Sequence, residues 1–298
     1  MTEKNKHIVP EGIGRERLSD YLIGKLQLLP SRKSVKKAIK AGEILVDEEL
    51  GTTGQWVEAG QKITYQSKDK PPSMIFEWRI EVVYEDEYLA IINKPAGFSV
   101  SGNHFHTIEN ALPFNLNVSN EPDALLRFRA VHRLDALTCG LLLVAKTKTS
   151  RILLGQLFEK KTIQKRYQAV VIGQLPNEGT IREPIQEKQS TTVFKTVQAV
   201  RSLRNDYLTL VDLFPKTGRT HQLRIHLSQL GFPILGDKLY GTAGEIMKGK
   251  GLFLCAVQLN FQHPFSDETI DISIEPPNKF QLLLERETRR WERFKNQE

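Results

Sequence analysis

The chain has 298 residues and a formal net charge of +7, because 42 Lys and Arg outnumber 35 Asp and Glu. This length predicts one large domain or a large and a small one, and the modest charge permits a polyanionic partner without requiring one. The two cysteines, Cys139 and Cys255, form no disulfide or zinc framework and favour a reducing compartment. The N-terminus lacks a signal-peptide core, and no apolar run approaches the ~18 residues of a membrane span. We therefore expect a soluble cytoplasmic protein.

The first part of the chain, after a lead-in over residues 1–14 that we expect to be frayed, alternates helical and strand patterns. Ser31 is a plausible N-cap, and Gly42 stands where a left-handed C-terminal cap is expected. The expected elements are a helix that buries Leu18, Tyr21 and Leu22, a second helix between Ser31 and Gly42, and strands at 43–47 and 60–65.

The second of these helices is strongly basic and has no acidic residue between its two caps. Its basic residues are Arg32, Lys33, Lys36, Lys37 and Lys40. One interpretation is an ordinary solvated surface. The other is a phosphate-binding face, because such a stripe can follow a nucleic-acid backbone.

The order helix, basic helix and hairpin, with "AGEILVD" and "VEAGQKI", resembles the alpha-L (S-four-type) RNA-binding module, over about residues 15–65. The resemblance implies that the basic helix binds RNA. Segment 67–73 then has the composition of a linker. We expect a small α/β RNA-binding domain at 1–66, a linker at 67–78, a larger domain at 79–276, and a docked C-terminal helix at 277–298.

The larger domain is predicted to be rich in β-strands, and one stretch stands out within it. The turn His132-Arg-Leu-Asp135 precedes an apolar run, Leu141–Ala145, that is typical of a buried strand. Arg133 and Asp135 therefore lie at the lip of a core element, where a rigid scaffold can direct charged side chains into a cleft. The alternative is an ordinary surface ion pair between these two residues.

A second polar cluster lies at the start of the helix predicted over residues 220–230. Arg219, His221, Gln222 and Arg224 gather there, where backbone N–H groups already favour anions. The chain has no Walker loop, Rossmann glycine fingerprint, Gly-x-Ser-x-Gly or CxxC motif. His104 and His106 form an HxH pair with no further ligand at suitable spacing, so we expect no metal site.

Several motifs, in order, resemble those of the RluA-type RNA pseudouridine synthases over about residues 80–276. They are "NKPAG", "AVHRLD" ending at Asp135, "LLLVAKT", "KRY" ending at Tyr167, and "GRTHQLRIH" followed by "PILGDKLYG". The resemblance implies an α+β fold with a mixed, mainly antiparallel sheet and flanking helices. It implies a cofactor-independent enzyme that isomerises uridine in structured RNA. Ribosomal large-subunit RNA is favoured over transfer RNA, and a monomer over an oligomer.

The resemblance also implies roles for individual residues. Asp135 would be the essential carboxylate in breaking the N1–C1′ bond, and whether it attacks C1′, attacks C6 or removes the 2′ proton stays open. Arg224 would pair with Asp135, Tyr167 would stack on the uracil, and Arg133 would fill the gap left by the extruded nucleotide. Arg219 and His221 would contact RNA. Cys139 stands where relatives carry Ser or Thr, which leaves its role open.

Two other classes of function are alternatives to an isomerase. A nucleoside glycosidase usually needs two carboxylates, and the sequence offers only one well-placed acid. A non-catalytic RNA-binding or ribosome-assembly factor with the same fold is the main alternative. It is disfavoured because Asp135, Tyr167 and Arg224 are all retained.

Overall fold

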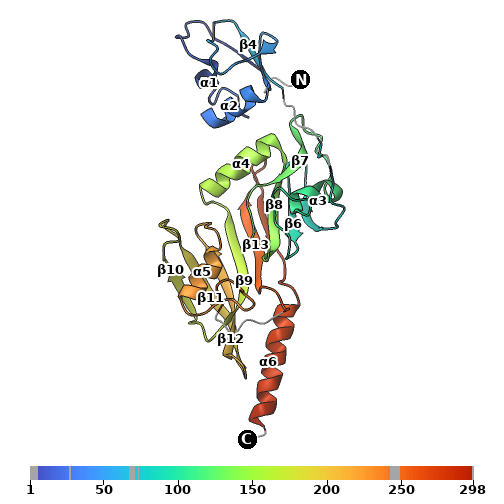
Figure 1. Cartoon of the computed structure of the whole chain (residues 1–298), viewed down its shortest axis with the longest axis vertical. Helices are drawn as coiled ribbons and strands as arrows, with labels where there is room; N and C mark the ends of the chain where they lie inside the picture. Colours follow the sequence, from blue (N-terminus) through green and yellow to red (C-terminus); the bar gives the residue numbers. More distant parts are fainter. Residues whose placement is uncertain (1–5, 27, 67–70, 73, 242–248, 297–298) are drawn as a thin grey trace.

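The computed structural model describes residues 6–26, 28–66, 71–72, 74–241 and 249–296. Within these ranges the strands form two separate sheets, one of four strands and one of ten. Figure 1 shows the smaller sheet at one end of an elongated molecule and the C-terminal helix at the other. Residues 67–70 and 73 of the expected linker lie outside the described residues, and the domain boundaries stay a prediction.

The smaller sheet has the strand order β1-β4-β2-β3 and packs against two helices. The prediction of a frayed lead-in was wrong for residues 6–8, which pair with β4. A three-residue edge strand whose Ile8 is 67% exposed carries no burial pattern that sequence reasoning could detect. The elements are β1 Lys6–Ile8, α1 Leu18–Tyr21, α2 Arg32–Lys40, β2 Ile44–Val46, β3 Glu49–Leu50 and β4 Lys62–Tyr65.

Helix α2 begins and ends where the sequence predicts. Ser31 Oγ accepts a hydrogen bond from Ser34 N at 3.2 Å, and the Ser34 side chain returns the contact to the Ser31 backbone. Gly42 follows the helix with a φ of +69°, the left-handed conformation that glycine tolerates. The helix buries Val35, Ala38 and Ile39, so its basic residues are turned towards solvent.

The larger sheet runs β10-β11-β12-β9-β13-β8-β6-β5, with β14 paired to β13 and β7 paired to β8. Its pairings are antiparallel except for β8 with β13, so the expected α+β class with a mainly antiparallel sheet is confirmed. The strands are β5 Glu81–Glu85, β6 Leu89–Lys94, β7 Ala124–Ala130, β8 Cys139–Thr147, β9 Gln164–Ile172, β10 Glu178–Ile181, β11 Thr192–Ser202, β12 Asp206–Pro215, β13 Leu254–Gln262 and β14 Thr269–Ser273.

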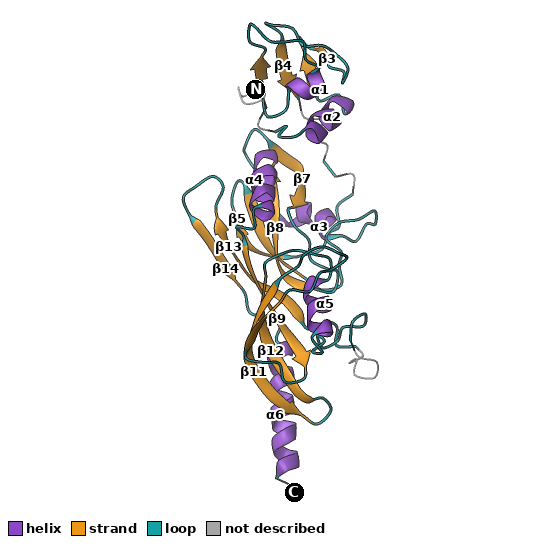
Figure 2. Cartoon of the chain, turned by 90° about the vertical axis from the view of Figure 1, so that its left-hand side faces the viewer, coloured by secondary structure: helices purple, strands orange, loops and turns teal. Residues whose placement is uncertain are grey.

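Four helices flank this sheet in the described part of the chain (Figure 2). The last of them packs on β11 through Phe280, Leu283 and Leu284, and its buried Glu287 accepts a hydrogen bond from Ser202. None of the described helices is long and apolar enough to cross a membrane. The helices are α3 Ile108–Asn115, α4 Lys148–Glu159, α5 Gln222–Gln229 and α6 Lys279–Lys295.

Strand β8 is the centre of the larger sheet, and all nine of its residues are buried. Gly140 allows it to approach β13, because a Cβ at this position would lie 2.2 Å from the Ala256 carbonyl oxygen. Beside it, Cys139 is in parallel register with Cys255, and both thiols are free and buried. Cys139 Sγ lies 3.6 Å from the Leu254 carbonyl oxygen, so a small side chain is required here.

Candidate active site

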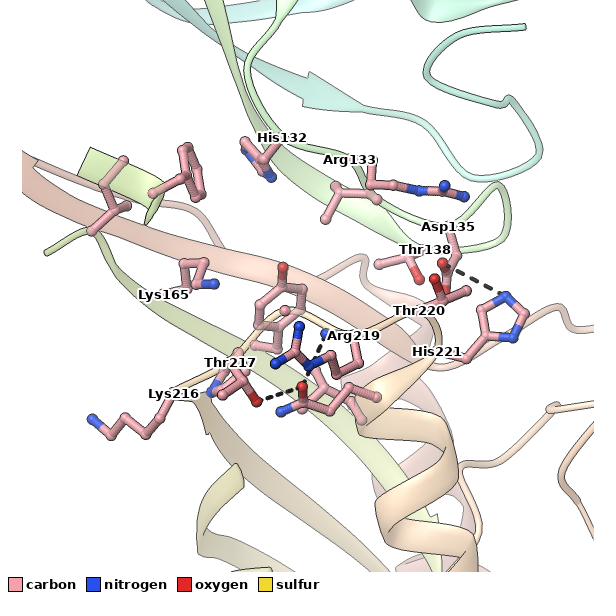
Figure 3. Close-up of a pocket in the computed structure, with 18 of the residues that line it drawn as sticks. His132, Arg133, Asp135, Thr138, Lys165, Lys216, Thr217, Arg219, Thr220 and His221 are labelled. Carbon is pink, nitrogen blue, oxygen red and sulfur yellow. Dashed lines mark hydrogen bonds and ion pairs between the residues drawn. The ribbon is translucent and has the colours of Figure 1, made fainter. Parts of the chain in front are cut away.

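A cavity of about 750 Å³ opens where the turn before β8 faces the start of β9 and the loop that leads into α5. Figure 3 shows the side chains that line it, from Lys165 and Lys216 on one side to Asp135 and His221 on the other. A cavity of this size falls within the usual range for sites that take small molecules. It collects Asp135, Tyr167, Arg224, Arg133, Arg219 and His221, all predicted from sequence, and none of the described residues of the basic helix.

The buried side chain of Lys94 holds the turn that carries Asp135 through hydrogen bonds to backbone carbonyl oxygens. Lys94, which is fully buried, donates from Nζ to the carbonyl oxygens of Pro95 at 2.9 Å, Ala136 at 3.1 Å and Thr138 at 2.7 Å. Burial lowers the pKa of Lys94 to about 8, although the charges of Cys139 and Asp135 act in the opposite direction. Sequence reasoning missed this role, because lysine is seldom fully buried.

Arg224 lies between two carboxylates. Its Nη1 is 3.6 Å from Asp135 Oδ2, while Nε and Nη2 donate to the two carboxylate oxygens of Asp237 at 2.7 and 2.8 Å. Burial alone would lower the pKa of Arg224, but the hydrogen bonds and charge of Asp237, and then the charge of Asp135, raise it above its ordinary value. Arg224 is therefore a permanent cation beside Asp135.

Asp237 combines a capping role with its contact to Arg224. Its Oδ1 does accept hydrogen bonds from the backbone N–H groups of Leu239 and Tyr240, as a cap would. Burial raises its pKa, but the hydrogen bonds from Arg224 and these N–H groups outweigh burial and lower it. Asp237 is thus a buried anion that orients Arg224, and sequence reasoning missed this because the two residues lie 13 positions apart.

His221 lies against the other oxygen of Asp135. Its Nε2 is 3.7 Å from Asp135 Oδ1 (Figure 3). Its Nδ1 is 2.9 Å from the Tyr240 hydroxyl. The residue adopts a φ of +55°, a left-handed conformation that costs free energy for a non-glycine residue. The expected RNA-binding residue is therefore also a neighbour of the proposed catalytic carboxylate.

Helix α5, which carries Arg224, is anchored by buried polar contacts. Gln222 Nε2 donates to Thr191 O and to Thr192 Oγ1, each at 3.0 Å. His226 Nδ1 also lies 2.9 Å from Thr192 Oγ1, and burial lowers the pKa of His226. These contacts make His226 a hydrogen-bonding residue that anchors α5.

Tyr167 lines the cavity from β9 and is largely enclosed. Burial, and then the negative charge of Asp135, raise the pKa of its hydroxyl well above the ordinary value for tyrosine. The hydroxyl is therefore neutral at physiological pH. A neutral aromatic ring next to the carboxylate fits the stacking surface that a uracil needs.

Arg133 and Arg219 occupy the rim. Arg133 is exposed, and its side chain extends past Asp135 without an ion pair to any described residue (Figure 3). Arg219 donates from Nε and Nη2 to Gln189 O, both at 3.2 Å. The local Arg133–Asp135 pair that sequence leaves open is thus not formed.

Comparison with known proteins decides the family. The model of the RNA pseudouridylate synthase family matches residues 88–229. Ribosomal large subunit pseudouridine synthase D of Nitrosomonas europaea is 32% identical over 301 residues, covering 93% of this chain and 86% of that protein. The RNA pseudouridine synthase YhcT of Bacillus subtilis is 30% identical over 267 residues, covering 84% of this chain and 87% of that protein. The chain belongs to the RNA pseudouridine synthase family.

The fold of this synthase also resembles solved members of the family. Human RNA pseudouridylate synthase domain containing 1 aligns with a TM-score of 0.55 and 25% identity, over 70% of this chain and 86% of that chain. The membership expected from the sequence motifs is confirmed, and with it the assignment of the synthase as an isomerase. The resemblance of residues 15–65 to an alpha-L module stays a prediction.

The donor chemistry of the synthase gives no candidate for a metal centre among the described residues. No group of three or more His, Cys, Asp or Glu side chains lies close enough there to hold a metal ion.

Proposed function

We propose that this synthase converts specific uridines of structured RNA, in large-subunit ribosomal RNA, into pseudouridine. The substrate class is supported by relatives such as ribosomal large subunit pseudouridine synthase C of Vibrio cholerae, which is 32% identical over 299 residues. The excess of basic residues supports a polyanionic substrate. We propose in addition that the exposed lysines of α2 contact phosphates of the same RNA.

The observation that carries the proposal is the placement of Asp135. Its Oδ2 lies 3.6 Å from Nη1 of Arg224, and its Oδ1 lies 3.7 Å from Nε2 of His221. Two basic side chains thus hold the Asp135 carboxylate in the cavity, where it would attack the nucleotide or accept a proton from it.

The reaction is an isomerisation that balances without a cofactor. The N1–C1′ bond of the uridine breaks, the uracil turns within the cavity, and a C5–C1′ bond forms. The proton on C5 is lost to solvent, and N1 gains one. Tyr167 would hold the turning ring by stacking, since stacking of a base on an aromatic side chain is worth about 1–3 kcal/mol. Arg133 would occupy the gap in the RNA.

The decisive experiment uses Asp135→Asn and large-subunit ribosomal RNA transcribed with [5-³H]uridine. The wild-type synthase should release tritium to water, and the variant should release none while still retaining the RNA on a filter. Tritium release by the variant at a rate comparable to wild type would contradict the role of Asp135. Tritium retention with the wild-type protein would contradict the choice of substrate.

A further inference from the structure

Lys165 is a half-buried cation on the wall of the cavity, and the proposed reaction does not use it. It precedes Tyr167 by two residues on β9, so both side chains project from the same face of the strand and line the cavity. Figure 3 shows Lys165 and Asp135 on opposite sides of this space. The two residues therefore define two ends of one cavity.

Within the described part of the chain, Nζ of Lys165 makes no hydrogen bond or ion pair. Its Nζ lies over the face of Phe158, at 5.8 Å from the ring centre. The other enclosed lysines of the larger sheet differ in this respect. Lys94 donates to three carbonyl oxygens, and Lys146 lies 2.7 Å from Glu85 Oε1.

An unpaired cation in such a position is costly, because burial disfavours its charged form. Burial does lower the pKa of Lys165. Its neighbour His132 offers no compensation, because burial, and then the charge of Lys165, lower the pKa of that imidazole to about 3 and leave it neutral. Among the described residues, no carboxylate forms an ion pair with Lys165, which points to a ligand as the source of the compensating anion.

We propose that Lys165 binds a backbone phosphate of the substrate RNA that flanks the target uridine, an inference that rests on the proposed function. The target nucleotide must contact Asp135, at the opposite end of the cavity. The anion beside Lys165 therefore belongs to the chain on one side of that nucleotide. Lys161 and Arg219 also line the cavity and extend the positive path that a phosphate backbone would follow.

The test compares Lys165→Met with Lys165→Arg and with Lys216→Met, which removes an exposed lysine from the same cavity. The assay is tritium release from [5-³H]uridine-labelled ribosomal RNA over a range of salt concentrations. Loss of a charge-assisted hydrogen bond should raise KM for Lys165→Met by about 10- to 100-fold and leave kcat within about 3-fold. The slope of log affinity against log salt should fall by about 1. Lys165→Arg should restore both quantities, and Lys216→Met should change KM by less than about 3-fold.

A thermal melt separates this role from a structural one. Removal of an unpaired, half-buried charge should leave the Tm of Lys165→Met unchanged or raise it. A lowered Tm, a fall in kcat with KM unchanged, or an equal loss in Lys216→Met would each overturn the inference. Filter binding of the same RNA measures the salt slope without catalysis. Failure of the proposed reaction would thus show as an inactive wild type, and failure of this inference as an unchanged slope.

Discussion

Asp237 binds Arg224 through two hydrogen bonds of 2.7 and 2.8 Å, whereas the carboxylate of Asp135 lies 3.6 Å from the same guanidinium. The stronger pair is also the more buried one, since the side chain of Asp237 is 1% exposed and that of Asp135 is 18% exposed. The orientation of Arg224 therefore depends on Asp237. Asp237 holds the Arg224 guanidinium beside Asp135, and the Asp135 carboxylate makes no short hydrogen bond to it and stays free to react.

Because Asp237 is the main partner of Arg224, the same Asp→Asn substitution should affect stability more at Asp237 than at Asp135. Asp237→Asn should lower the free energy of unfolding by about 3 kcal/mol, because it leaves Arg224 as a poorly paired buried charge. Asp135→Asn should change it by less than about 1 kcal/mol, because Arg224 retains its main partner. Urea denaturation followed by circular dichroism measures both. Equal losses in the two variants would contradict this assignment.

Gly140 lies in β8, shortly after the turn that carries Asp135. Its φ of +107° is unfavourable for other residues, and a Cβ would lie 2.2 Å from the oxygen and 2.6 Å from the nitrogen of Ala256. Gly140→Ala should therefore destabilise the protein by about 3 kcal/mol or more, by strain and by separation of β8 from β13.

The matched control is Gly155→Ala in helix α4, where no heavy atom lies within 4 Å of an added Cβ. This change should raise stability by about 0.5–1 kcal/mol, because alanine is the better helix former. Thermal melts of both variants give the comparison. A Gly140→Ala variant as stable as the Gly155→Ala variant would show that β8 and β13 can separate at little cost.

The parts of the fold that follow from local patterns could be predicted from sequence, and the parts set by distant contacts could not. The caps of α2 and the buried run of β8 were predictable because capping chemistry and apolar runs act over a few residues. Strand β13 was missed, although it completes the core between β8 and β9. Helix α3 was also missed, because it is short and contains Pro113.

In the site, too, residues that belong to local motifs could be predicted, whereas residues placed by distant contacts could not. Motif resemblance alone predicted that Asp135, Tyr167 and Arg224 belong to one site, and the three line one cavity. The partners that position them, Asp237 and Lys94, were not predicted. Each is a charged residue that is almost completely buried through long-range contacts, and composition and periodicity give no indication of such burial.

His132 should make the stability of the protein fall as the pH decreases. Burial, and then the charge of Lys165, lower its pKa to about 3 from an ordinary 6.5, and its Nε2 accepts a hydrogen bond from Leu143 N at 3.0 Å. Between these two pH values the unfolded chain binds more protons than the folded one, so stability falls as pH decreases below about 6.5. By linkage, His132 should cost up to about 2 kcal/mol at pH 5 relative to pH 7.5.

His132→Gln keeps an acceptor for Leu143 N and removes the titrating group. The loss of unfolding free energy between pH 7.5 and pH 5 should therefore be smaller in the variant than in wild type. Other histidines contribute to both proteins, so the difference between the two curves is the quantity to compare. Parallel curves would mean that His132 already binds a proton in the folded protein at pH 5.

The basic residues of helix α2 should contribute unequally to RNA affinity, because Arg32 is ion-paired within the protein. Arg32 Nε lies 2.8 Å from Asp20 Oδ1, whereas Lys36 and Lys40 are exposed and make no ion pair within the described residues. Replacing both lysines by Gln should lower the slope of log affinity against log salt by about 2, because each phosphate contact contributes about 0.9. Arg32→Gln should lower it less.

Lys195→Gln, on the exposed face of β11 in the larger sheet, is the control. Filter binding of ribosomal RNA between low and moderate salt measures these slopes. A double variant with the slope of wild type would show that Lys36 and Lys40 face solvent and do not contact RNA phosphates.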